Sequence, residues 1–299
     1  MDTTKKGRGM AAACLAIVLL AGSAASAGVF LRGDGTVTTA TSPRGEVVDY
    51  AADGVYRFNA LRIVAEGSGW DVFTLFFAVP ALFAAVPSIA RYSFRGRLFA
   101  VGMLAYVFYQ YLMYALAWAL GPLFPLFIVI FAASLAVMIW ILSDLGIASA
   151  AERFSARFPR RGMAILCLAM AAVLLLMWVA RIAAALGGAV DGILLGQTTL
   201  VVQALDLGLI VPLAVFTAVA ALRGSAIGYV LSSTLVVKAV AMSVAICAML
   251  VGAWKTEGRL EILPFVLFAT AAVVATCLGV RMYRSITPAE AGASPASRK

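Results

Sequence analysis

The chain has 299 residues, of which 64% are hydrophobic and only 12% are charged. A soluble domain contains roughly 45–50% apolar and about 25% charged residues, so this composition excludes an ordinary water-soluble domain and favours a membrane protein. Histidine is absent, which excludes histidine-based nucleophile activation and histidine ligation of a metal or haem by this chain alone. Four cysteines stand singly, without a CxxC motif, so no metal site and no cofactor are predicted.

The first apolar segment, Met10–Phe30, follows a short basic N-terminus at residues 1–9. It is long enough to cross a bilayer, because about 20 helical residues span ~30 Å of hydrocarbon. The triplet Ala25–Ala27 suits signal peptidase, which leaves two alternatives. A retained helix gives a bundle of eight transmembrane helices, whereas a cleaved signal gives seven. We favour retention, because apolar residues continue as far as Leu31.

Residues 32–69 form the only long polar segment between apolar ones, and we expect them outside the cytoplasm. Two β-rich runs, Glu46–Ala52 and Val55–Ala60, flank the dipeptide Asp53-Gly54. An Asp-Gly pair between alternating strands predicts a β-hairpin. The segment is too short for a core of its own, so the hairpin should lie over the helix ends as a lid or a plug.

Seven further apolar segments follow: Val72–Ala90, Leu98–Leu120, Pro122–Leu142, Met163–Leu186, Leu200–Leu222, Ile227–Gly252 and Ile262–Val280. The sequence therefore predicts an all-α transmembrane domain over residues 10–283. Residues 284–299 are rich in Ala, Ser and Pro and predict a disordered cytoplasmic tail.

Basic residues concentrate on one side of the predicted bundle. With all eight spans present, the clusters at residues 91–97 and 153–161 fall on the side of the N-terminus. The positive-inside rule places that side, with both termini, in the cytoplasm. We interpret the net charge of +9 as a topology signal that also contacts anionic lipid headgroups, and not as a nucleic-acid surface.

A weak repeat relates the second and sixth spans. Val79-Pro80 precedes Arg91 as Val211-Pro212 precedes Arg223, and each span also carries an aspartate, Asp71 or Asp206. Both spans run from outside to inside in the predicted topology. The pattern suggests two parallel four-helix halves, as some transporters have, although chance similarity is a serious alternative in a chain so rich in Ala, Val and Leu.

Two charges within apolar segments mark the candidate site, because ionisable groups in a membrane are costly and usually functional. Asp206 lies in the sixth span on one helix face with Gln203, and Lys238 lies in the middle of the seventh span. The third span adds Tyr106, Gln110 and Tyr114 on one face, and Asp71 and Arg181 are expected at the outer rim of the same site.

A direct contact between the two charges is doubtful. At 1.5 Å per residue, Asp206 lies roughly 9 Å and Lys238 roughly 21 Å below the outer ends of their predicted helices. Pro212 frees the carbonyl of Gly208, which becomes an alternative partner for the lysine. A structural clamp between helices, a ligand site and catalysis all remain open. Asp144, near the end of the fourth span, is expected simply at the membrane interface.

Three stretches carry a resemblance to a known group. They are Val55–Phe58 with Trp70–Phe76, Tyr106–Tyr111 with Tyr114, and Thr198–Pro212. These stretches are similar to a family of uncharacterised bacterial multi-spanning inner-membrane proteins. The resemblance implies a bacterial inner membrane as the location, and it implies no activity and no functional residue.

The leading functional prediction is a carrier or ligand-binding membrane protein with a polar pocket in the outer half of the bundle. Its ligand would be a small molecule or a lipid. The first alternative is a non-catalytic subunit that anchors or assembles a membrane-protein partner. The second is a membrane enzyme that uses carboxylates, for which Asp71 and Asp206 are the candidate pair. An outward-facing cavity that reaches Asp206 and Lys238 would separate the three.

Overall fold

The computed structural model describes residues 2–287, and the predicted tail lies outside the described residues from residue 288 onward. The elements in chain order are α1 (Thr3–Phe30), β1 (Val37–Thr41), β2 (Val47–Ala51), α2 (Leu61–Phe73), η1 (Thr74–Ala78), α3 (Val79–Ala90), α4 (Phe94–Ala117), α5 (Phe124–Leu145), α6 (Ile147–Ala150), η2 (Ala151–Arg153), α7 (Arg160–Leu186), α8 (Val201–Leu205), η3 (Asp206–Ile210), α9 (Val211–Leu222), α10 (Ala226–Glu257) and α11 (Ile262–Ser285).

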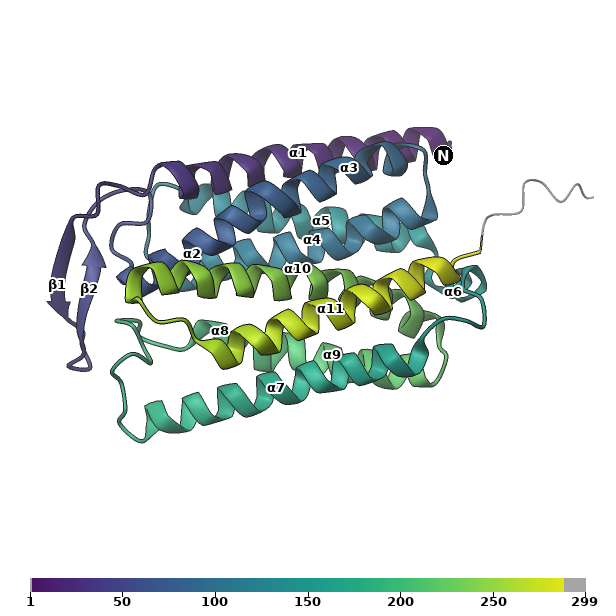
Figure 1. Cartoon of the computed structure of the whole chain (residues 1–299). Helices are drawn as coiled ribbons and strands as arrows, with labels where there is room; N and C mark the ends of the chain where they lie inside the picture. The colour runs from purple at the N-terminus through teal and green to yellow at the C-terminus, as the bar shows by residue number, and fades with distance from the viewer. Residues whose placement is uncertain (1, 288–299) are drawn as a thin grey trace, which may run out of the picture.

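Eight helical spans within residues 2–287 are long and apolar enough to cross a membrane, and they fit an integral membrane protein. The spans lie side by side in one bundle (Figure 1). The β-strands project from one end, which we call the hairpin end. The start of α1 and the end of α11 lie at the opposite end, which we call the terminal end.

Two of the spans share an unusual construction. The second consists of α2, η1 and α3, and the sixth consists of α8, η3 and α9, where η1 and η3 are π-helical segments. Each π segment lies directly before a Val-Pro pair, and proline has no N–H to donate. The N–H of Val79 therefore reaches Thr74 and that of Val211 reaches Asp206, five residues back. Such π turns often occur at functional sites.

The core centres on α4, which is the most buried of the spans. It packs against α5 and α10, while α10 also contacts α2, α9 and α11. Glycines permit the close approach of α2 and α10. A Cβ at Gly69 would collide with the carbonyl of Ala248, and a Cβ at Gly252 would collide with that of Ala65. Small residues of this kind let membrane helices approach closely.

The β-hairpin exists, but the predicted pairing was wrong. The strand Val47–Ala51 pairs antiparallel with Val37–Thr41, and the turn between them contains Pro43 and Gly45. The sequence around Asp53-Gly54 instead makes a loop that returns the chain to the helices, with an isolated bridge between Tyr50 and Ala60. The run of β-branched residues before Pro43 is the better strand former and took the partner's place.

Two helices extend further than expected at the hairpin end. The second span begins at Leu61 instead of Val72, and α10 continues to Glu257 instead of Gly252. Polar residues in these extra turns ion-pair with one another, so the helices continue past their apolar segments. The segment between the first two spans is correspondingly shorter than residues 32–69.

Asp144 is not a simple interfacial residue. Its side chain is only 6% exposed, and its carboxylate binds Lys6 at 2.6 Å and Arg97 at 2.5 Å. The hydroxyl of Tyr92 donates to the same carboxylate at 2.5 Å. The contacts tie α1, α4 and α5 together at the terminal end.

Candidate functional site

Asp206 lies at the first residue of the π segment η3, and it is 8% exposed. Two donors from other helices hold its carboxylate. The hydroxyl of Tyr109 on α4 donates to one oxygen, and the indole Nε1 of Trp178 on α7 donates to the other at 2.7 Å. A buried carboxylate requires such donors, because an unpaired charge in a low-dielectric interior is costly. Asp206 thus links three spans.

Tyr109 also connects Asp206 with Lys238. The Nζ atom of Lys238 on α10 lies 4.4 Å from the centroid of the Tyr109 ring, within the range of a cation–π contact. Within residues 2–287, no salt bridge joins Lys238 to Asp206, and no hydrogen bond joins it to the Gly208 carbonyl. The two charges therefore contact the ring and the hydroxyl of the same tyrosine.

A crevice of about 340 Å³ runs between α2, α4, α7, α8, α10 and α11, and both charges line it. Five of the predicted site residues contribute to its wall: Asp206, Lys238, Gln203, Tyr114 and Arg181. Its volume lies within the range of ordinary ligand pockets. One continuous cavity therefore brings together residues from four spans that the sequence separates by more than a hundred positions.

The remaining predicted residues lie outside the crevice wall. The hydroxyls of Tyr106 and Thr74 are 2.9 Å apart in the buried core, between α4 and η1. Gln110 is 1% exposed, and neither polar atom of its side chain has a hydrogen-bond partner in the part of the chain that the structure describes. Its place on the Tyr106 face therefore does not bring it to the crevice.

Asp71 lies behind the crevice and not at its rim. Its carboxylate accepts a hydrogen bond of 2.6 Å from Tyr56 and one of 3.4 Å from Tyr114, and it is 1% exposed. Gly28 of α1 lies directly against this carboxylate, so α1 covers it from the far side. Burial and the nearby Asp71 raise the pKa of Tyr56 well above its usual value, so Tyr56 remains a donor.

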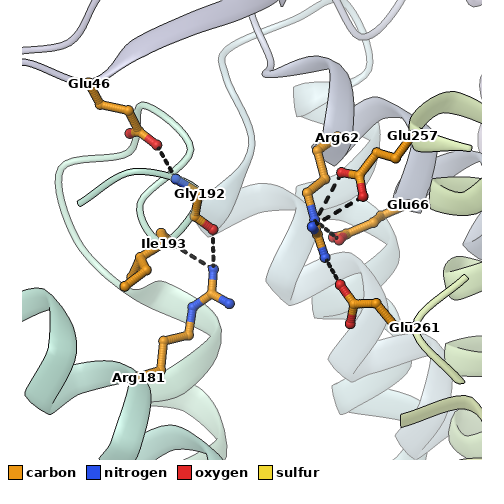
Figure 2. A network of polar contacts seen from close by, with 8 residues as sticks. All are labelled: Glu46, Arg62, Glu66, Arg181, Gly192, Ile193, Glu257 and Glu261. Carbon is orange, nitrogen blue, oxygen red and sulfur yellow. Dashed lines mark hydrogen bonds and ion pairs between the residues drawn. The ribbon is translucent and has the colours of Figure 1, made fainter. Parts of the chain in front are cut away.

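The crevice reaches the hairpin end at Arg62, Glu66, Arg181 and Glu261, and we call this part of it the mouth. One side of the mouth belongs to an ion-pair cluster (Figure 2). Arg62 of α2 binds Glu66 at 2.9 Å, Glu257 of α10 at 3.2 Å and Glu261, just before α11, at 2.6 Å. These side chains are 24–42% exposed, so each pair alone is weak. Together they fasten α2 to the connection between α10 and α11.

Arg181 of α7 lies across the mouth from that cluster (Figure 2). It donates to the main-chain oxygen of Ile193 at 2.6 Å and, more weakly, to that of Gly192 at 3.4 Å. Glu46 accepts from the N–H groups of Gly192 at 3.0 Å and Gly196 at 2.8 Å. The loop between α7 and α8 is therefore held from both sides, by Arg181 of α7 and by Glu46, the residue before β2.

Sequence reasoning missed several residues of this arrangement. The Arg62–Glu66 pair has the i,i+4 spacing of a helical ion pair and was within reach of pattern analysis. Tyr109 and Trp178 gave no signal, because aromatic residues are common in apolar spans and their partners depend on helix packing. Glu46 gave none either, since it contacts a loop far along the chain.

No protein-family model, curated protein or solved structure matches this chain.

Proposed function

We propose that this integral membrane protein is a carrier or ligand-binding protein, with its ligand site in the crevice that contains Asp206 and Lys238. The observation that carries the proposal is that this cavity reaches both charges. A dry, closed bundle would have suited an assembly subunit. Converging carboxylates would have suited an enzyme, but Asp71 and Asp206 are held by different tyrosines, and only Asp206 lines the crevice.

The hairpin end is taken as the outer face in this proposal. The positive-inside pattern places the arginines of the terminal end in the cytoplasm, so the mouth opens outward. The ligand then enters the outer half of the bundle at the charged mouth. The polar residues of the wall are few and placed among apolar ones, as is typical of a pocket that orients a ligand.

A parallel repeat supports the carrier alternative. The π segments begin at Thr74 and Asp206, 132 residues apart. The same separation relates Arg91 to Arg223, and it relates Ser93, the N-cap of α4, to Ser225, the N-cap of α10. We take the shared spacing as a sign of two equivalent halves, an arrangement that carriers use around a central site.

The repeat places Thr74 in the position of Asp206, where the sequence alone had placed Asp71. It likewise places Tyr106 in the position of Lys238. In the first half, Thr74 and Tyr106 form a neutral hydrogen bond inside packed protein. The second half has two charges at the same places, beside a cavity. The halves have thus separated into a structural half and a ligand-binding half.

Cysteine labelling tests the proposal with two adjacent residues of α7. Met177 lines the crevice, whereas Leu176 is 72% exposed on the outer surface of the bundle. In a protein whose four native cysteines are replaced, Met177→Cys should react with a charged, membrane-impermeant thiol reagent added from outside. Leu176→Cys should stay unreactive, because it faces lipid and its thiolate cannot form there. If neither cysteine reacted with the reagent, no water-filled pocket would open outward, and the proposal would be wrong.

A further inference from the structure

The shape of the crevice limits its occupant. Its wall on α7 extends from Met163 to Arg181, which corresponds to roughly 27 Å of helix and is close to the ~30 Å thickness of a hydrocarbon core. A cavity of about 340 Å³ spread over that length is long and narrow. Such a slot suits an extended chain better than a compact molecule.

The α7 wall of the crevice is polar toward the hairpin end and apolar below it, while α10 contributes Lys238 and Ser232 at the deeper level. Arg181 and Trp178 of α7, with Asp206, lie toward the hairpin end, and the α7 wall from Leu174 to Met163 is apolar. Leucine and methionine together form most of the apolar lining, and three of the methionines, Met163, Met170 and Met177, lie on α7. Methionine is flexible and adapts to irregular apolar partners, so this lining suits a hydrocarbon chain of variable shape.

The carboxylates that line the crevice have hydrogen-bond or ion-pair partners, whereas two of its cations have no carboxylate in contact among the residues that the structure describes. Asp206 has two donors, and the carboxylates of Glu66 and Glu261 are bound to Arg62. The two other cations of the wall, Arg181 and Lys238, form no salt bridge within residues 2–287. Arg181 contacts only main-chain oxygens, and its Nε atom is buried without a partner among the described residues. The open positions therefore attract an anion.

Two helices of the crevice wall, α7 and α11, also face the apolar surface of the bundle. Pro264 and Phe268 of α11 line the crevice, while the neighbouring Leu263 is 81% exposed on the apolar surface. On α7, Met177 likewise lines the crevice, while its neighbour Leu176 is exposed on the outer surface of the bundle. The crevice is therefore separated from the lipid-facing surface by only one layer of helices.

We infer that the crevice binds an anionic phospholipid of the outer leaflet, with its phosphate at Arg181 and a hydrocarbon chain along the methionine-lined wall of α7. Lys238 supplies a second positive charge deeper in the same crevice. This inference rests on the proposed function, because it identifies the ligand class of the same site.

Tryptophan quenching by brominated lipid tests the inference. Trp70, Trp118 and Trp178 line the crevice, while Trp140 and Trp254 lie on the outside and are replaced by phenylalanine. The protein, in a neutral detergent, is titrated with phosphatidylglycerol brominated on its chains, and with brominated phosphatidylcholine as the neutral comparison. We expect quenching by phosphatidylglycerol to saturate at one lipid per protein. Phosphatidylcholine should bind about tenfold more weakly, as expected for the loss of one charge contact.

Charge variants assign the headgroup. Arg181→Gln should weaken phosphatidylglycerol binding about tenfold, and Arg181→Lys should restore most of it. Arg44→Gln is the matched control, because Arg44 is exposed in the hairpin turn and lies outside the crevice wall. Equal affinities for both lipids, with no effect of Arg181→Gln, would overturn the inference while Met177→Cys labelling still supported the pocket. Absence of both quenching and labelling would overturn the pocket itself.

Discussion

Replacing Lys238 by methionine separates a ligand site from a structural clamp. Methionine keeps the length and most of the volume of the side chain and removes only the charge. On insertion scales, a lysine at the centre of a membrane helix costs ~2.5–3.5 kcal/mol, so methionine is at least as compatible with the membrane. That cost largely cancels in the unfolding assay, because the helix stays in an apolar medium in both states. The substitution loses the contact with the Tyr109 ring, which contributes about 2 kcal/mol when desolvated. The free energy of unfolding should therefore fall by no more than about 2 kcal/mol.

Asp144→Asn is the matched positive control for a clamp. Asp144 binds Arg97 directly, and both side chains are less than a tenth exposed. Removing one partner of a buried pair leaves an uncompensated charge and costs about 3–5 kcal/mol. Asp144→Asn is therefore expected to cost more stability than Lys238→Met, although each removes one buried charge.

The assay combines unfolding by sodium dodecyl sulfate in mixed micelles, followed by circular dichroism, with the brominated-lipid titration. Removing a cation from the crevice weakens the electrostatic attraction for a phosphate, and ~1.4 kcal/mol corresponds to about tenfold in affinity. Lys238→Met should therefore weaken phosphatidylglycerol binding by about tenfold while the fold remains stable. A loss of 3 kcal/mol or more in stability, with unchanged lipid affinity, would refute the reasoning and identify Lys238 as a clamp.

Two further substitutions probe the support around the crevice. Gly28→Ala should destabilise the protein by about 1–3 kcal/mol, because its methyl group would overlap the Asp71 carboxylate. Gly22→Ala on the same helix is the control. It should be neutral or slightly stabilising, since a Cβ there makes an ordinary contact. Equal effects of the two in the same unfolding assay would contradict the close packing of α1 on Asp71. Glu46→Gln should raise the rate of amide hydrogen exchange several-fold in residues 187–200, because one amide oxygen cannot replace both carboxylate acceptors. The control is Asp49→Asn on the exposed side of the hairpin, which should leave exchange in that loop unchanged. Unaltered exchange in Glu46→Gln would show that the loop holds its shape without the hairpin.

The helical spans could be predicted from the sequence because hydrocarbon thickness fixes the length of an apolar segment. Their ends could not, since the extra turns of α2 and α10 depend on Arg62 meeting Glu257, nearly two hundred residues away. The hairpin was predicted in the right segment with the wrong partner strand. An Asp-Gly turn signal was overridden by the better strand residues before Pro43.

The candidate site could be predicted in part for a similar reason. Asp206 and Lys238 could be found because a charged residue in an apolar segment is costly and usually has a function. Gln203 and Arg181 also line the crevice, but Gln110 and Tyr106 face packed protein. The direction in which a helix face points depends on its neighbours, and spacing alone cannot supply it. Tyr109, the residue that joins the two charges, has no chemical feature that distinguishes it from the other tyrosines of α4.

The loop before α8 forms part of the crevice wall. In the repeat that we propose, residues 193–200 correspond to the first turns of α2, yet α8 begins only at Val201. Positive φ angles at Leu195 and Gly196 interrupt the helix there. Leu194, Leu195 and Gln197 of this loop line the crevice. The charged end of the crevice is therefore bounded on one side by loop residues, whereas the corresponding part of the second span is helical.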